Sequence, residues 1–273
     1  METIVVGNRT IAYRRYGRHI DARRPPLLLL HGAGANHLIW PPQLRHLPHT
    51  EVYALDLPGH GASPGPGCSS ISAYTEVVRD FVDALELPWF VLAGHSMGGA
   101  IALDFALAYG YRLAGVALVA TGAQLRVSPA LLDNLANDFE EATQQIVAYS
   151  YMPATPSRLK EAYLRLLRDN DPRVLYTDFV ACNAFDVRDR LRSLAISALI
   201  ICGNKDKMTP PALGITLHDQ IADSRLHLVD NAAHNVMVEQ PACIAEFFSA
   251  FLSELSDDDG DASLPASQDG GSE

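Results

Sequence analysis

Short apolar runs alternate with segments of helical spacing over the first 120 residues of the chain. The runs 27–30, 52–55, 89–93 and 113–120 are apolar at nearly every position. A strand needs apolar side chains on both faces when helices cover both faces of its sheet. The alternation therefore predicts an α/β fold with a mostly parallel central sheet, flanked by helices that form right-handed crossovers.

The pattern continues at both ends of the chain. Residues 3–6 and 10–16 predict two strands joined at Gly7-Asn8-Arg9, a sequence typical of a hairpin turn. The apolar run 198–202 and the segment Leu226-His227-Leu228-Val229 predict strands in the second half. Apolar spacing predicts the core helices over about 39–47, 72–87, 100–108, 211–221 and 241–255.

The strand pattern is interrupted between residues 123 and 192, where the apolar spacing indicates only helices. Thr155-Pro156 and Asp171-Pro172 are helix-start signals with proline at the first helical position. The segment is too long for a plain crossover between two strands. We therefore expect a helical cap at 123–192, inserted between two parts of one α/β core at 1–122 and 193–255.

Charge and composition narrow the class of partner. The chain carries a formal net charge of −11, and residues 256–273 hold six carboxylates and no lysine or arginine. This acidic tail is poor in apolar residues, so we expect it to be disordered. An acidic chain without a basic patch gives no electrostatic reason to bind nucleic acid or an anionic membrane surface.

Several further signals are missing from the sequence. Apolar runs fall well short of the roughly 20 residues that span a bilayer, and the first residues lack the basic and apolar regions of a signal peptide. We therefore expect a cytoplasmic protein without a membrane span. The cysteines have no metal-ligand spacing and the glycine loops match no nucleotide motif, so we expect no metal and no cofactor. The oligomeric state stays open.

The candidate chemistry centres on Gly94-His95-Ser96-Met97-Gly98, between the apolar run 89–93 and an Ala/Leu-rich helix. A serine at the apex of such a strand–turn–helix needs small residues two positions away on each side, because its backbone is strained. The glycines meet that need in the pattern G-x-S-x-G, the nucleophile elbow. Ser96 is therefore the candidate nucleophile, with a plain helix N-cap as the alternative.

An acid and a base follow in the order that this elbow requires. Asp206 and His234 each come directly after a predicted parallel strand, and parallel strands deliver their C-terminal ends to one edge of the sheet. His234 would take the proton of Ser96, and Asp206 would orient the imidazole. Asp230 is the only nearby rival for the acid.

The oxyanion that forms during acyl transfer needs two hydrogen-bond donors. The backbone N–H of Met97 follows the nucleophile and is one of them. The other is expected from the loop after the strand 27–30, where small residues allow the backbone to approach the substrate. Ala33 is the first choice and Gly34 the second.

These motifs resemble the α/β-hydrolase superfamily, in its branch of cap-bearing serine esterases. The matching segments are 31–36, 56–63, 94–98, 203–206 and 232–241, in the expected order. The resemblance implies a Ser-His-Asp triad at Ser96, His234 and Asp206. One family variant places the acid after the strand ending near Ala120, but 121–124 contain no carboxylate, which favours Asp206.

The substrate pocket is the least readable part of the sequence. Its candidate lining residues come from the oxyanion loop, the cap and the acid loop: His37, Trp40, Leu125, Tyr151, Met152, Phe179 and Met208, with Tyr149 as a further candidate. Each of these side chains is equally typical of plain core or cap packing.

The sequence thus predicts a carboxylesterase-type serine hydrolase that acts through an acyl-enzyme. Its expected partner is a small-molecule ester with a small to medium acyl or aryl group. A C–C bond hydrolase or a lactonase would use the same triad and cap. A non-catalytic ligand receptor on this fold is a third possibility, against which the intact triad argues. The serine excludes family members that use an elbow aspartate.

Overall fold

The structure, a computed structural model, describes residues 1–87 and 89–258. Its centre is an eight-stranded sheet in the order β1-β2-β4-β3-β5-β6-β7-β8. The strands are β1 (Glu2–Val6), β2 (Arg9–Tyr16), β3 (Leu27–Leu30), β4 (Val52–Leu55), β5 (Phe90–His95), β6 (Leu113–Val119), β7 (Ala198–Gly203) and β8 (Ser224–Val229).

The sheet is antiparallel only at its N-terminal edge, where β2 pairs with β1 and with β4. All other pairings are parallel, which confirms the predicted α/β architecture. The parallel strands end at one edge of the sheet. There the register places Leu30 of β3 opposite Gly94 of β5, so the loop after β3 and the turn after β5 begin side by side.

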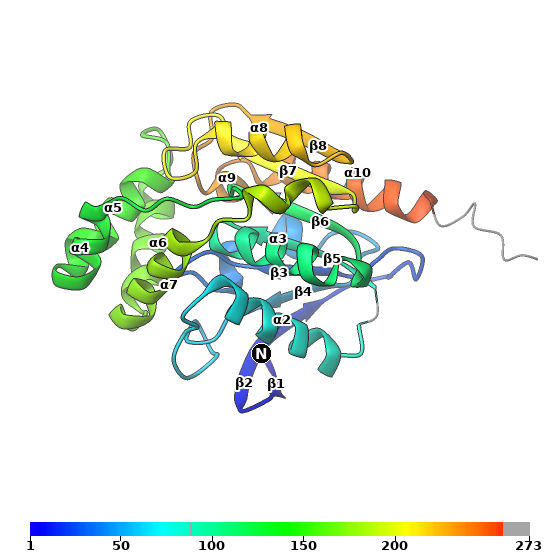
Figure 1. Cartoon of the computed structure of the whole chain (residues 1–273), viewed down its shortest axis with the longest axis horizontal. Helices are drawn as coiled ribbons and strands as arrows, with labels where there is room; N and C mark the ends of the chain where they lie inside the picture. Colours follow the sequence, from blue (N-terminus) through cyan, green and yellow to red (C-terminus); the bar gives the residue numbers. More distant parts are fainter. Residues whose placement is uncertain (88, 259–273) are drawn as a thin grey trace, which may run out of the picture.

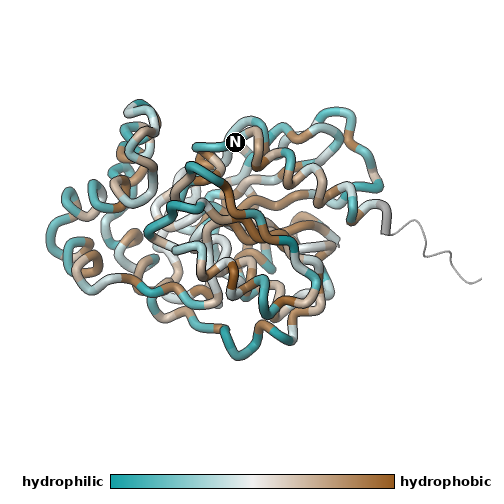
Figure 2. Tube along the Cα trace, turned by 90° about the horizontal axis from the view of Figure 1, so that it is seen from above, coloured by the Kyte–Doolittle hydropathy of each residue, from teal (hydrophilic) through white to brown (hydrophobic). Residues whose placement is uncertain are grey.

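Helices of the core cover the sheet. They are α1 (Pro42–Arg45), α2 (Ile71–Ala84), α3 (Met97–Tyr109), α8 (Pro211–Gln220), α9 (Val236–Glu239) and α10 (Pro241–Asp258). Helix α2 packs against α3, which Figure 1 shows in front of the sheet, and α1 packs against α10. All four side chains of β3 are fully buried, and Figure 2 shows the most hydrophobic segments gathered in the interior. Burial on both faces explains the unbroken apolar runs.

The helical segment between β6 and β7 forms a separate group beyond the strand ends, seen in green at the left of Figure 1. We call its four helices the cap: α4 (Pro129–Asn137), α5 (Phe139–Ser150), α6 (Ser157–Arg168) and α7 (Pro172–Ala184). A 3-10 helix, Arg188–Ser193, leads back to the core. The only extended pairing in this segment, among the described residues, is an isolated bridge between Gln124 and Asp186.

Some local predictions differ from the structure. The helix expected over 39–47 is a 3-10 turn, His37–Ile39, followed by the short α1, because Pro41 and Pro42 separate the two. Thr155 does not cap α6; Pro156 holds the N-cap position, and the Thr155 hydroxyl bonds to Glu239 instead. Asp171 does cap α7, through a bond from the Arg173 N–H.

The C-terminal helix is longer than expected. Helix α10 continues to Asp258, three residues past the predicted end. The rest of the acidic tail, 259–273, lies outside the described residues. In the part of the chain that is described, none of the helices is both long and apolar enough to span a bilayer.

Candidate active site

Ser96 stands at the sharp turn between β5 and α3. Its backbone has φ 54° and ψ −116°, a strained conformation for a residue with a side chain. A Cβ on Gly94 would lie 1.9 Å from the Gly98 carbonyl oxygen, and a Cβ on Gly98 would lie 2.4 Å from the Leu30 carbonyl oxygen. Only glycine fits at both positions, as the elbow pattern predicts.

Contacts with β6 and with the segment after it hold this turn in place. The Ser96 N–H donates to the Val119 carbonyl at 2.9 Å. The Thr121 hydroxyl donates to the Ser96 carbonyl, also at 2.9 Å. Two bonds to a neighbouring strand end thus oppose the backbone strain, so the position of the serine does not depend on its own loop alone.

Asp206 and His234 are in direct contact. Asp206 Oδ2 lies 2.9 Å from His234 Nδ1, and both side chains are buried. The other carboxylate oxygen accepts the N–H groups of Met208 and Thr209, at 2.8 and 2.9 Å. Burial alone would raise the pKa of Asp206, but His234 and these hydrogen bonds outweigh it and lower the pKa. The carboxylate therefore stays ionised beside the imidazole.

Thr209 adds a second contact to this pair. Its hydroxyl donates to Asp206 Oδ2 at 2.7 Å and lies 3.1 Å from His234 Nδ1. Asp230, the rival acid, instead accepts a hydrogen bond from Asn204 Nδ2. With Asp206 on Nδ1, the Nε2 atom of His234 is left for a proton acceptor or donor in the cavity, which Ser96 and His234 both line.

The His95 side chain contacts the backbone and the ring of His234. Its Nε2 lies 3.0 Å from the His234 carbonyl oxygen and donates to it, and the two rings are 4.8 Å apart. Burial, followed by the proximity of His234, lowers the pKa of His95 to about 3. His95 therefore stays neutral and adds no positive charge beside His234.

Glu239 of α9 fixes the loop that carries His234. Its Oε2 accepts the N–H of Ala233 at 2.6 Å. Its Oε1 accepts the N–H of Met152 at 2.8 Å, from the cap segment between α5 and α6. The N–H of Asn235 also donates to the Ser150 carbonyl of α5, at 3.0 Å. The histidine loop is thus bonded to both the core and the cap.

The predicted oxyanion donors also lie at this edge. Met97 begins α3, where the first N–H groups of a helix have no partner within the helix. Ala33 lines the cavity together with Ser96. The N–H of Gly34 donates to Asp178 Oδ2 of α7 at 3.3 Å. The structure therefore favours Ala33, the first choice, over Gly34 as the second donor.

A cavity of about 340 Å³ lies between the core and the cap, and Ser96 is one of the residues that line it. Three predicted pocket residues line it: Leu125, Phe179 and Met208. Tyr149 does as well. Its other walls come from both sides of the cap–core boundary: Gly32, Ala33, His95, Gln124, Arg126, Val127, Ser128, Leu131, Ile146, Tyr163, Cys182, Lys207, Thr209, Pro210, Leu213 and His234. Burial raises the pKa of Tyr163 to about 12, so its hydroxyl stays neutral.

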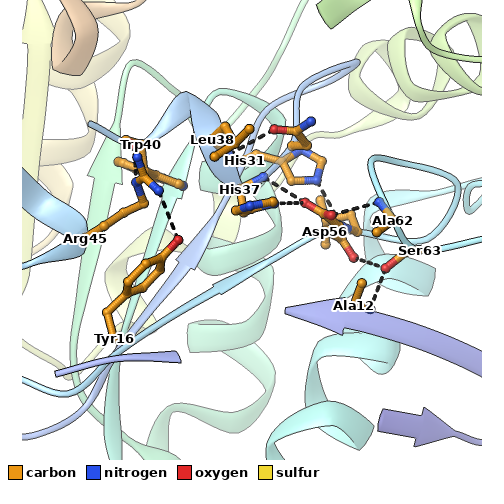
Figure 3. Close-up of polar contacts among 12 residues, drawn as sticks. Ala12, Tyr16, His31, His37, Leu38, Trp40, Arg45, Asp56, Ala62 and Ser63 are labelled. Carbon is orange, nitrogen blue, oxygen red and sulfur yellow. Dashed lines mark hydrogen bonds and ion pairs between the residues drawn. The ribbon is translucent and has the colours of Figure 1, made fainter. Parts of the chain in front are cut away.

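The other four predicted pocket residues lie elsewhere. His37 donates to Asp56 Oδ1 through its backbone N–H at 2.8 Å and contacts it through Nδ1 at 2.7 Å, as Figure 3 shows. Trp40 is fully buried and packs edge-on near the His95 ring. Tyr151 packs edge-on against Tyr163, and Met152 is held by Glu239. Their aromatic or apolar character reflects packing rather than contact with the cavity.

Asp56 is a structural carboxylate. Its other oxygen accepts the N–H of Ala62 at 2.9 Å, and its backbone carbonyl accepts the Ser63 hydroxyl (Figure 3). Burial raises its pKa, but the bonds from His37 and Ala62 outweigh that and lower it. Asp56 thus joins the loop after β3 to the loop after β4.

Among the described residues, groups of three or more side chains able to hold a metal ion are absent.

Comparison with known proteins gives the family. The sequence profile described as the alpha/beta hydrolase fold matches residues 25–241. The chain belongs to the alpha/beta hydrolase fold family. A pimeloyl-[acyl-carrier protein] methyl ester esterase of Neisseria meningitidis is 28% identical over 239 residues, which cover 82% of this chain and 91% of that protein.

Two further similar proteins show the range of this hydrolase family. A 2-hydroxy-6-oxo-2,4-heptadienoate hydrolase of Pseudomonas putida is 26% identical over 250 residues, covering 83% of this chain and 88% of that protein. The crystal structure of the enol-lactonase from Burkholderia xenovorans superimposes with a TM-score of 0.84 at 24% identity, covering 92% of this chain and all of that one. The fold of this hydrolase is therefore shared by enzymes with different named substrates.

Sequence reasoning missed several residues that support the site in this hydrolase. Thr209 lies three positions after Asp206, so its spacing was available as a signal. Thr121 and Glu239 contact backbone groups of Ser96 and Met152, which lie far away in the sequence. Asp178 of the cap reaches the oxyanion loop, and no local pattern marks it. These contacts depend on tertiary packing, which apolar spacing does not encode.

Proposed function

We propose that this protein is a serine hydrolase of carboxylic esters, with Ser96, His234 and Asp206 as its catalytic triad. The observation that carries the proposal is the Asp206–His234 contact of 2.9 Å beside the strained Ser96, on one cavity. The esterases among its relatives support the ester as the substrate class. We also propose that residues 123–192 act as the cap of the cavity.

The geometry supports an acyl-enzyme mechanism. His234 takes the hydroxyl proton of Ser96 as Ser96 Oγ attacks the ester carbonyl carbon, and the N–H groups of Ala33 and Met97 receive the oxyanion. The tetrahedral adduct collapses, the C–O bond to the alcohol breaks, and His234 returns the proton to the leaving oxygen. Water then attacks the acyl group in the same way and releases the acid. Asp206 stabilises the imidazolium in both halves.

The test is turnover of 4-nitrophenyl esters of increasing chain length, with lactones alongside, by the wild-type protein and by Ser96→Ala. We expect burst kinetics and ester turnover in the wild type, and loss of activity by a factor on the order of 10³ or more in the variant. Retained circular dichroism shows that the variant is folded. Near-wild-type turnover by Ser96→Ala would sink the proposal.

Comparing the turnover of lactones with that of esters decides which substrate the enzyme prefers. A fluorophosphonate probe distinguishes an esterase or lactonase from a non-catalytic ligand receptor. An enzyme with an activated Ser96 reacts covalently with the probe and gains its mass. A receptor with an inert serine stays unlabelled. A wild-type protein that labels at Ser96 but cleaves neither esters nor lactones would point to the C–C bond hydrolase instead.

A further inference from the structure

Two of the residues that line the active-site cavity carry positive charge. They are Arg126, from the segment between β6 and α4, and Lys207, next to Asp206 in the loop after β7. Both are exposed. Among the described residues that line the cavity, aspartate and glutamate are absent. The described lining of the cavity thus contains two cationic side chains and no carboxylate, although the net charge of the chain is −11.

Neither cation is paired with a carboxylate in the described part of the chain. Within residues 1–87 and 89–258, Arg126 and Lys207 form no ion pair, whereas nine other arginines do. The nearby carboxylate of Asp186, which bonds to Gln124, is already held by Arg188. Bonds from Arg188 lower the pKa of Asp186 to about 2.

The second nearby carboxylate, Asp206, is also engaged. Both of its oxygens accept hydrogen bonds from residues other than Lys207. Arg126 and Lys207 come from segments far apart in the sequence, and both line this one cavity. Other lining residues, among them Leu131, Ile146 and Phe179, are apolar. The cavity therefore has an apolar part and a cationic part.

We propose that this cavity selects esters that carry a carboxylate remote from the scissile bond, bound by Arg126 and Lys207. This inference rests on the ester hydrolase proposed above and names its substrate class. A guanidinium and an ammonium group form charge-assisted hydrogen bonds with a carboxylate, while the connecting carbon chain packs on the apolar wall. A neutral ester makes only the apolar contacts.

The test compares monomethyl adipate with methyl hexanoate, its counterpart without the carboxylate, by release of methanol. The readout is the ratio of their kcat/KM values in the wild type, Arg126→Gln, Lys207→Gln and the double variant. Exposed ion pairs of this kind predict that the ratio falls about threefold in each single variant and about tenfold in the double. Lys205→Gln is the matched control, since Lys205 is an exposed lysine of the same loop outside the cavity lining; it keeps the wild-type ratio.

Binding separates a failure of this inference from a failure of the proposed hydrolysis. Calorimetric titration of both compounds into Ser96→Ala needs no turnover. We expect monomethyl adipate to bind at least about tenfold more tightly than methyl hexanoate, with the preference reduced at high salt. If the 4-nitrophenyl esters are not cleaved, the hydrolase proposal fails and this titration alone decides the inference. An equal kcat/KM ratio in wild type and double variant, or monomethyl adipate binding no tighter than methyl hexanoate, overturns it.

Discussion

His60 Nε2 lies 2.8 Å from Asp178 Oδ2, and this contact joins a buried side chain of the core to a buried side chain of the cap. The same carboxylate accepts the Tyr74 hydroxyl at 2.6 Å and the N–H of Gly34 at 3.3 Å. Asn170, just after α6, donates to the Gly34 carbonyl at 2.7 Å. Both backbone groups of Gly34 are thus held by cap side chains, directly beside the proposed donor Ala33.

Asp178→Ala should therefore affect both stability and catalysis. It leaves His60 and Tyr74 buried without their partner, and removing one partner of a buried pair costs about 3–5 kcal/mol in free energy of unfolding. We expect kcat to fall more than KM rises, because Ala33 loses the support of its neighbour. Urea unfolding and ester kinetics measure the two effects.

Asp189→Ala is the control for this substitution. Asp189 is exposed on the 3-10 helix after the cap. Its loss should change the free energy of unfolding by no more than about 0.5 kcal/mol. A similar small change in Asp178→Ala would show that the cap contact does not stabilise the fold.

The stability of the protein should decrease on acidification because of two buried neutral histidines. Burial, followed by a neighbouring histidine, lowers the pKa of His31 to about 4 and that of His95 to about 3. The unfolded chain binds these protons near pH 6.5, whereas the folded chain does not. Their contribution is therefore full above about pH 6.5 and is lost as pH falls toward 4 for His31 and toward 3 for His95.

His60 opposes this trend. Burial lowers its pKa, but Asp178 outweighs burial and raises it. Its contribution is therefore full below about pH 6.5 and is lost as pH rises through the folded value. Two histidines thus lower the stability on acidification and one opposes them. We expect the free energy of unfolding, measured in urea at pH 7, 6 and 5, to fall as the pH falls. Each of the two histidines contributes up to about 1.4 kcal/mol per pH unit.

The substitution His31→Gln measures how much of this pH dependence of the free energy of unfolding comes from His31. His31 Nε2 accepts the Leu57 N–H, and Nδ1 donates to the Gly32 carbonyl. The glutamine amide offers one acceptor and one donor but does not titrate. The variant should show a shallower pH dependence, while His19→Gln, at an exposed site, should keep the wild-type slope. An unchanged slope in His31→Gln would remove His31 from the explanation.

Thr209 should act on the rate of turnover through the Asp206–His234 pair. Thr209→Val keeps the shape of the side chain but removes the hydroxyl that bonds to Asp206. The loss of one hydrogen bond to a charged group, about 1.5 kcal/mol or more, predicts a fall in kcat of about tenfold. Thr209→Ser restores the hydroxyl and should recover most of kcat. Equal kcat values in the valine and serine variants would contradict this role.

The elbow should tolerate no side chain at Gly98. A Cβ there would lie 2.4 Å from the carbonyl oxygen of Leu30 and 2.5 Å from that of His31, so Gly98→Ala must displace backbone. We expect loss of ester turnover and a loss of stability of about 2 kcal/mol or more. Gly110→Ala is the matched control, because nothing lies within 4 Å of its Cβ and its φ is −54°. It should leave stability equal or raise it by up to about 1 kcal/mol.

The sheet was predictable from sequence because burial on both faces leaves an unbroken apolar run. The strands before Ser96 and Asp206 are buried along their whole length, whereas β8, before His234, is a half-buried edge strand. The structure brings Asp206 and His234 into contact. Position at a strand end is a topological property, so it follows from the order of elements. The extra residues of α10 were missed because its acidic end has no apolar spacing.

The cavity walls were less predictable for a physical reason. Trp40 and Tyr151 have the same aromatic character as Phe179, yet only Phe179 lines the cavity. Which face of a cap helix turns toward the core depends on contacts such as Asp178 with His60, between residues 118 positions apart. Local spacing carries no information about such pairs. The cationic residues of the cavity were missed for the same reason.

The hydrogen bonds of Gly34 limit which cap segments from related proteins could replace the cap of this protein. A chimaera that replaces α4–α7 would discard Asp178 and Asn170 but retain Gly34, His60 and Tyr74 on the core. The new cap would have to supply a buried acceptor for three donors and a donor for one carbonyl. Exchange of caps to change substrate range should therefore succeed only when these partner groups are transplanted as one set.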